Sequence, residues 1–150
     1  MKKLSFLMII AVLAVIVTVL APSRVEALPA VQSQFFGMVG IVEGVQTARL
    51  NVVNVAPADT RTPRTPCMVE LMFFDSDGEM LAMAMVTLDP GKAAFHDFTD
   101  SVYEVGRRLQ IRAEVMIMGD KVSCNVIPTL EIYDMETMKT EVFMDPVPHL

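Results

Sequence analysis

The chain has 150 residues, with 12 basic and 18 acidic side chains, two cysteines and no tryptophan. This length is typical of one domain. The net charge of −6 argues against binding to nucleic acid, which requires clustered lysine or arginine to neutralise phosphates.

The N-terminus resembles a signal segment. Lys2 and Lys3 precede an apolar stretch over residues 4–20, and Val25-Glu26-Ala27 offers the small or apolar side chains that precede a cleavage site. We therefore predict a signal peptide over residues 1–27, which forms a hydrophobic signal helix and is cleaved after Ala27. The alternative is an uncleaved membrane anchor, because a stretch of 17 residues, apolar apart from Ser5 and Thr18, is near the lower limit for crossing a bilayer.

Export has consequences for the rest of the chain. Removal of Lys2, Lys3, Arg24 and Glu26 leaves 9 basic and 17 acidic side chains, a net charge of −8. The expected location is the periplasm or the medium. If the segment stays uncleaved, it tethers the protein to the inner membrane, and it is the only part of the chain that we expect to contact the membrane. Residues 28–34 are predicted to be a linker.

The cysteine pair is expected to form a disulfide. Cys67 and Cys124 allow one intramolecular pairing, and export places them where disulfides persist. Two free thiols that serve as soft metal ligands are the alternative. A pair so distant in the sequence favours a structural bridge.

Short apolar runs separated by turn residues every ten positions or so predict an all-β domain over residues 35–145. The clearest run alternates apolar residues from Leu109 to Ile117 with polar ones, which is typical of antiparallel strands with one buried face. The expected strands are 36–42, 47–55, 68–74, 79–88, 93–98, 108–117, 129–133 and 140–144. Seven or eight strands without a helix predict a two-layer antiparallel sandwich of immunoglobulin-like architecture, followed by a tail over residues 146–150.

The stretch from Gly44 to Val142 resembles small exported bacterial sandwich proteins. The similarity lies in residues 49–54 (RLNVVN), 73–78 (FFDxxG), 88–91 (LDPG) and 111–113 (IRA). These are strand and turn positions, so the resemblance implies fold and export and carries no catalytic residue.

Methionine is the most unusual feature of the composition, with 13 residues, 11 of them beyond the signal segment. Met83 and Met85 form one Met-x-Met pair, and Met116 and Met118 form another. On a strand, this spacing places both thioethers of a pair on one face. We expect these four residues to form an apolar interaction face for another protein or an envelope component, or for a second copy in a homo-oligomer.

The alternative function is Cu(I) binding in the periplasm. Thioethers select this soft ion, and the ligands would come from Met83, Met85, Met116 and Met118, with His96 as a further candidate. His96 itself is predicted to be a surface residue of its strand, pointing away from the side chain of Asp97. No nucleophile motif accompanies it, so we expect a non-enzymatic protein without a cofactor.

Overall fold

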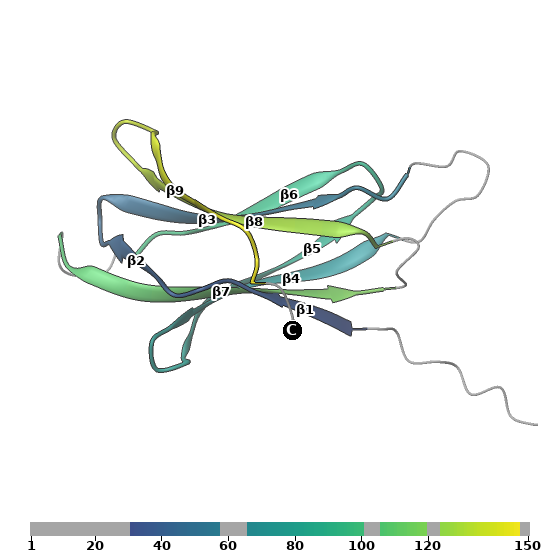
Figure 1. Cartoon of the computed structure of the whole chain (residues 1–150), viewed down its shortest axis with the longest axis horizontal. Helices are drawn as coiled ribbons and strands as arrows, with labels where there is room; N and C mark the ends of the chain where they lie inside the picture. The colour runs from purple at the N-terminus through teal and green to yellow at the C-terminus, as the bar shows by residue number, and fades with distance from the viewer. Residues whose placement is uncertain (1–30, 58–65, 101–105, 120–123, 148–150) are drawn as a thin grey trace, which may run out of the picture.

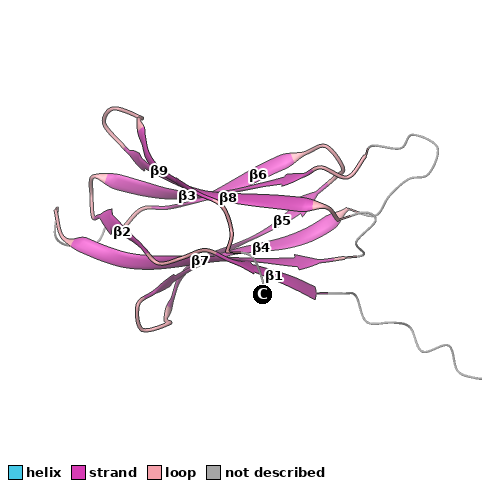
Figure 2. Cartoon of the chain, in the orientation of Figure 1, coloured by secondary structure: helices cyan, strands magenta, loops and turns pink. Residues whose placement is uncertain are grey.

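The computed structural model describes residues 31–57, 66–100, 106–119 and 124–147, which form nine strands and contain no helix (Figure 1, Figure 2). The strands are β1 (Val31–Phe35), β2 (Val39–Val42), β3 (Gln46–Asn54), β4 (Cys67–Asp75), β5 (Met80–Leu88), β6 (Ala93–Phe98), β7 (Arg108–Met118), β8 (Val126–Asp134) and β9 (Thr140–Met144). The all-β prediction is thus confirmed for these residues. The predicted signal segment 1–27 and the last three residues of the predicted tail lie outside them.

The strands form two antiparallel sheets that lie face to face (Figure 1). Sheet A has the order β1-β7-β4-β5, and β2 also pairs with β7. Sheet B has the order β6-β3-β8-β9. The sequence predicted seven or eight strands, and the described residues contain nine.

The additional strand is β1, which occupies residues 31–34 of the predicted linker 28–34, whereas residues 28–30 lie outside the described residues. Val31 to Phe35 pair with β7, with Val31 opposite Met118 and Phe35 opposite Glu114. Gln32 and Gln34 interrupt the apolar pattern that marks a strand in the sequence. The Gln34 side chain donates a hydrogen bond to the Val126 carbonyl of sheet B at 3.4 Å, whereas the buried Nε2 of Gln32 has no hydrogen-bond partner among the described residues.

The core lies between the two sheets and is built by alternation. On β7, Ile111, Ala113, Val115 and Ile117 are buried, and the residues between them face outward, as the sequence predicted. On β3, Leu50 and Val52 approach this layer from sheet B. Burial of these aliphatic side chains is the main force that holds the sheets together.

The strand pairing does not confirm the predicted immunoglobulin-like architecture. In that fold, strands B and E share one sheet, and strands C, F and G share the other. The pairs β3–β6 and β4–β7 occupy the places of B–E and C–F. However, β8 pairs with β3 in sheet B, whereas strand G of an immunoglobulin domain pairs with F.

The predicted disulfide between Cys67 and Cys124 is present, with a Cα–Cα distance of 5.4 Å. Cys67 is the first residue of β4 in sheet A, and Cys124 precedes β8 of sheet B by two residues. The bridge therefore joins the two sheets at one end of the sandwich.

Asn54, at the end of β3, organises the same end of the molecule. Its side chain is fully buried, and its amide donates hydrogen bonds to the Cys67 sulfur at 3.2 Å and to the Leu88 carbonyl at 3.3 Å. Its Oδ1 accepts from the backbone N–H groups of Ala56 at 3.1 Å and Asn125 at 3.3 Å. One side chain thus ties together four segments that the sequence separates.

We expect Asn54→Ala to lower the free energy of unfolding by about 2–3 kcal/mol, because the substitution leaves buried hydrogen-bonding groups without partners. Urea denaturation of the oxidised protein measures this change. Asn51→Ala is the control, since that side chain faces outward on the same strand, and its effect is expected to stay below about 0.5 kcal/mol. Equal effects for the two variants would contradict the proposed role of Asn54.

Candidate functional site: the methionine face

The outer surface of sheet A carries seven methionines on three adjacent strands. On β4, Val69, Leu71 and Phe73 face the core, so the intervening side chains point outward. The registers of β5 and β7 against β4 place their outward residues in the same plane. We call this surface the methionine face; its methionines are Met68, Met72, Met80, Met83, Met85, Met116 and Met118.

The strand register brings these side chains into direct contact range. Met68 lies opposite Met118 of β7, and Met72 lies opposite Met83 of β5. Directly opposite residues in antiparallel strands have Cβ atoms about 4.5–5.5 Å apart. Flexible thioether side chains at that spacing can contact one another across neighbouring strands.

Much of this layer is open to solvent. Met80, Met83 and Met85 of β5 are 56 %, 52 % and 53 % exposed, and Met68 of β4 is 44 % exposed. Met72 is covered by its neighbours and is only 7 % exposed, although it lies outside the core cluster. The methionine face is therefore an apolar surface in which four methionines are well exposed and Met72 is covered by its neighbours.

Charged groups divide the face. Glu70 lies between Met85 and Met116, and Glu114 lies opposite Met72. Arg112 borders it, and its guanidinium lies over the ring of Phe74 at 5.0 Å from the ring centre. A ligand of this face would meet thioethers together with two carboxylates.

The sequence located part of this face. Met83, Met85, Met116 and Met118 lie on the outer surface of the same sheet, where the strand periodicity of β7 had placed the second pair. β4 lies between the two pairs, and its contributions Met68 and Met72 were not anticipated. The signal for them was the alternation of Met68, Glu70 and Met72 with Val69 and Leu71, which the run of apolar residues concealed.

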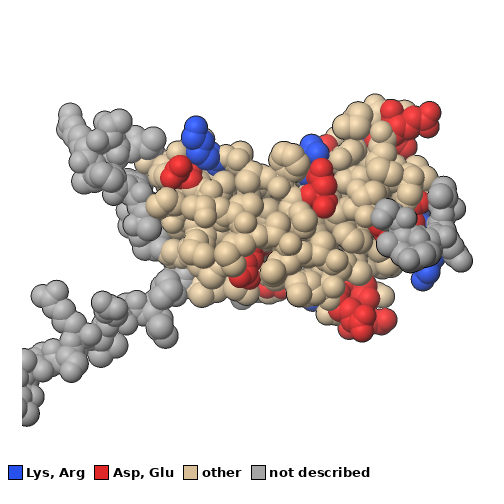
Figure 3. All heavy atoms as spheres, turned by 180° about the vertical axis from the view of Figure 1, so that it is seen from behind, with Lys and Arg blue, Asp and Glu red and all other residues tan. Residues whose placement is uncertain are grey.

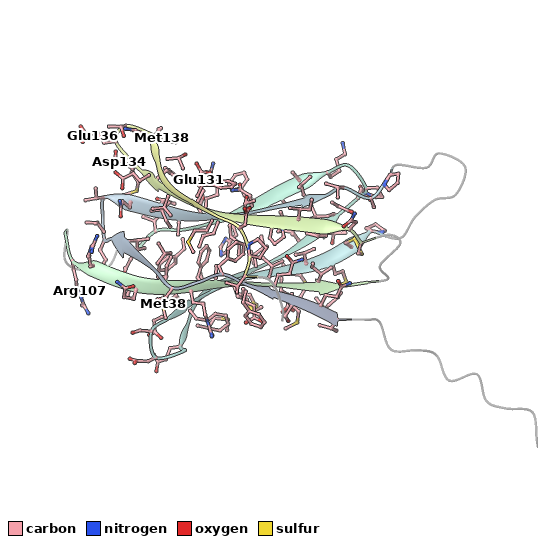
Figure 4. All side chains as sticks on the ribbon, viewed as in Figure 1. Met38, Arg107, Glu131, Asp134, Glu136 and Met138 are labelled. Atoms are coloured by element: carbon pink, nitrogen blue, oxygen red, sulfur yellow. A yellow bond between two sulfur atoms is a disulfide. The ribbon has the colours of Figure 1, made fainter. Side chains whose placement is uncertain are left out.

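Other exposed methionines do not belong to the face. Met138 is at the tip of the β8–β9 hairpin, and Met38 lies in the connection between β1 and β2 (Figure 4). At the same hairpin, the Asp134 carboxylate accepts hydrogen bonds from the backbone N–H groups of Thr137 and Glu136, and these bonds lower its pKa. Because Met138 lies outside the methionine face, it provides an exposed methionine for control substitutions.

The prediction of His96 as a surface residue was wrong. His96 lies opposite the fully buried Leu50 in the β3–β6 register, and its ring is 5.8 Å from that of Phe73. Its Nε2 is buried and has no hydrogen-bond partner among the described residues. The error arose because β6 carries apolar residues on both faces, so periodicity could not orient it.

The structure separates the ligands of the Cu(I) hypothesis. His96 faces the core from sheet B, whereas the four methionines face outward from sheet A. Met83 and Met85 are also two strands away from Met116 and Met118, about 10 Å at the usual strand spacing. These five side chains do not converge on one point in this structure.

The outer surface of sheet B has a different character. Arg49 makes a two-pronged hydrogen-bonded ion pair with Asp97, at 2.7 and 2.8 Å, and lies over the ring of Phe95. These hydrogen bonds raise the pKa of the guanidinium above its ordinary value. A shallow apolar hollow of about 210 Å³ lies beside Phe95 and ends near Ile127. The Arg49 guanidinium on this surface is thus already engaged by Asp97.

Two further observations apply to the residues that the structure describes. They contain no group of three or more histidine, cysteine, aspartate or glutamate side chains placed to hold a metal ion. No helix long and apolar enough to cross a membrane occurs among them.

No protein-family model matches the sequence, and no curated protein matches it. The fold is similar to the crystal structure of protein 1070 of Thermotoga maritima, with 15 % sequence identity and a TM-score of 0.48. The similarity covers 79 % of this chain and 94 % of the other. The resemblance to exported sandwich proteins therefore has no sequence match behind it.

Proposed function

We propose that this chain is an exported, non-enzymatic β-sandwich protein that acts by binding another protein or an envelope component through its methionine face. The observation that carries the proposal is the gathering of seven methionines on one side of sheet A, four of them at least 44 % exposed. Single exposed apolar residues are common on protein surfaces, but a contiguous apolar patch marks an interaction site.

The chemistry of the face suits a partner with an apolar surface and a basic group. Methionine is unbranched and polarisable, so a methionine layer adapts to partners of irregular shape. Glu70 and Glu114 interrupt the layer and would attract a lysine or arginine of the partner. Anionic surfaces are disfavoured by these carboxylates and by the overall negative charge.

Export is the part of the proposal that rests on the sequence of residues 1–27. The disulfide is compatible with an oxidising compartment, where such bridges persist. An immunoglobulin-like relationship is proposed for the four strands β3, β4, β6 and β7 alone, because β8 joins the opposite sheet.

We expect Met85→Glu and Met116→Glu each to weaken the association of the exported protein with its partner at least tenfold. Each substitution buries a new carboxylate in an apolar contact, beside the existing charge of Glu70. The measurement is the fraction of protein that co-purifies in a native complex from the envelope of an exporting bacterial host, read by native mass spectrometry. The intact mass of the same sample identifies the processed N-terminus.

Met138→Glu is the matched control, because this methionine is 66 % exposed at a hairpin tip away from sheet A. It should leave the complex intact. A complex that survives both face substitutions, or that all three variants abolish equally, would refute the assignment of the contact to the methionine face.

A further inference from the structure

Among the described residues, strand β5 is a free edge of sheet A. It pairs with β4 on one side and is the last strand in the sheet order. The register shift between Phe73 and Phe74 affects only its hairpin end, so Ala82 to Leu88 form a regular strand. Every second backbone N–H and C=O group of such an edge points away from its sheet.

The other sheet edges among the described residues carry features that discourage strand pairing. β6 contains His96 and Asp97, and β9 contains Glu141. On the opposite side of sheet A, β1 and β2 are short and separate, and the Phe35 carbonyl accepts a hydrogen bond from the N–H of Val147. Charged residues and interruptions are the usual means by which proteins protect sheet edges.

β5 has neither charged residues nor an interruption of this kind. Its nine residues, MLAMAMVTL, include no charged side chain and no proline. A long regular apolar edge of this kind pairs readily with another strand. The side of the sandwich that carries β5 and β6 shows a broad expanse of uncharged surface, with separate charged groups around it (Figure 3).

We propose that β5 is the docking site for a second copy of this chain, which pairs with it antiparallel about a two-fold axis and joins the two A sheets into one. An edge strand related to itself by such an axis is self-complementary, as a closed dimer requires. Two copies without residues 1–27, each of net charge −8 (9 basic and 17 acidic side chains), repel one another, and β5 is the long edge at which neither copy presents charge to the other.

The charges at the two ends of β5 favour the antiparallel arrangement. The β4–β5 hairpin carries Asp75, Asp77 and Glu79, whereas the turn after β5 carries Asp89 and Lys92. Antiparallel pairing brings the Lys92 end of one copy beside the acidic hairpin of the other. A parallel arrangement would instead place the two acidic hairpins together, at a cost in repulsion.

The dimer would extend the methionine face. Met83 and Met85 point outward on β5, so antiparallel pairing places those of both copies side by side in one sheet. The proposal does not depend on what the face binds, because strand pairing uses the backbone. It predicts that the binding surface of the proposed function is presented in duplicate.

The first test is the mass in solution of the disulfide-bonded protein without residues 1–27, by light scattering and sedimentation over a range of concentrations. We expect a dimer, and we expect Thr87→Lys to weaken dimerisation at least tenfold, because Thr87 is exposed on β5 and a lysine there protects the edge. Ile127→Lys is the control: it adds the same charge at an exposed position of β8, between β3 and β9 in sheet B, and should leave the dimer unchanged.

The second test locates the contact by disulfide trapping. Both natural cysteines are in the bridge, so one added cysteine supplies the only free thiol. We expect a cross-linked dimer from Met83→Cys, Met85→Cys or Thr87→Cys, whichever lies at the axis, because directly paired strand positions match disulfide geometry. Met138→Cys should stay uncross-linked.

A monomer at tens of micromolar would overturn the proposal, as would a dimer insensitive to Thr87→Lys that cross-links at none of the β5 positions. Cross-linking of the β5 cysteines to a different protein in the exporting host would replace the second copy by a foreign strand. Thr87 lies opposite Met68 on the methionine face, so the separating variant is Met116→Glu on β7, two strands from the β5 edge. It should weaken partner binding and leave the dimer intact, so loss of the dimer and loss of partner binding are read separately.

Discussion

Phe73→Ala is expected to lower the free energy of unfolding by about 3–5 kcal/mol, the cost of truncating a buried phenylalanine. Phe73 is fully buried, on the inner face of β4. Its ring centre is 5.5 Å from that of Phe98 and 5.8 Å from that of His96, both on β6. Truncation therefore opens a cavity between the sheets and removes the aromatic contacts that connect β4 with β6.

Urea denaturation of the oxidised protein, followed by tyrosine fluorescence and circular dichroism, measures this change. The matched control is Phe95→Ala, three residues before Phe98 on the outer side of β6, where the side chain is 56 % exposed. Its expected effect is at most about 1 kcal/mol, because the truncation removes only the contact of the ring with the Arg49 guanidinium. A loss below about 1 kcal/mol for Phe73→Ala would show that β4 and β6 do not pack through this ring.

The parts of the fold that the sequence predicted are those with strict alternation. β7 is the best case, because Ile111, Ala113, Val115 and Ile117 alternate with polar or methionine side chains and are buried as expected. The disulfide was also predictable, since two cysteines permit one pairing. In both cases local chemistry leaves few alternatives.

The parts that were missed depend on contacts between distant segments. β1 was assigned to a linker because its residues are of mixed character, yet Gln32 and Gln34 lie opposite the inward residues of β7 and only Gln34 reaches a hydrogen-bond acceptor in sheet B. His96 was placed on the surface, although its ring packs against Phe73 of the other sheet. The sequence alone predicts neither the pairing of β1 with β7 nor the inward position of His96, because each depends on which strand lies next to it or across from it.

Only part of the candidate site was predicted, because the rest of it also depends on how distant strands are arranged. Periodicity places Met116 and Met118 on one face of a strand. Strand order decides that Met68 and Met72 of β4 lie between them and β5, and sequence periodicity carries no information about strand order. The methionine face therefore became complete only when the three strands were arranged in their sheet.

Removal of the disulfide is expected to have a similarly large effect on stability. The bridge closes a loop with a sequence separation of 57 and joins β4 of sheet A to the segment before β8 of sheet B. In the chain-entropy description, closing a loop of this length destabilises the unfolded chain by about 4 kcal/mol. We therefore expect the double variant Cys67→Ala/Cys124→Ala to lose about 4 kcal/mol, with the measured value falling within about 2–5 kcal/mol.

The comparison that isolates the covalent bond uses three samples in urea: the oxidised protein, the reduced protein and the double variant. Reduction should bring the natural sequence close to the double variant and should leave the double variant unchanged. Because Cys67 also accepts the hydrogen bond of the Asn54 amide, the double variant should be slightly less stable than the reduced protein. Equal midpoints for the oxidised and reduced protein would mean that the two sheets are held at this end by the Asn54 network and core packing alone.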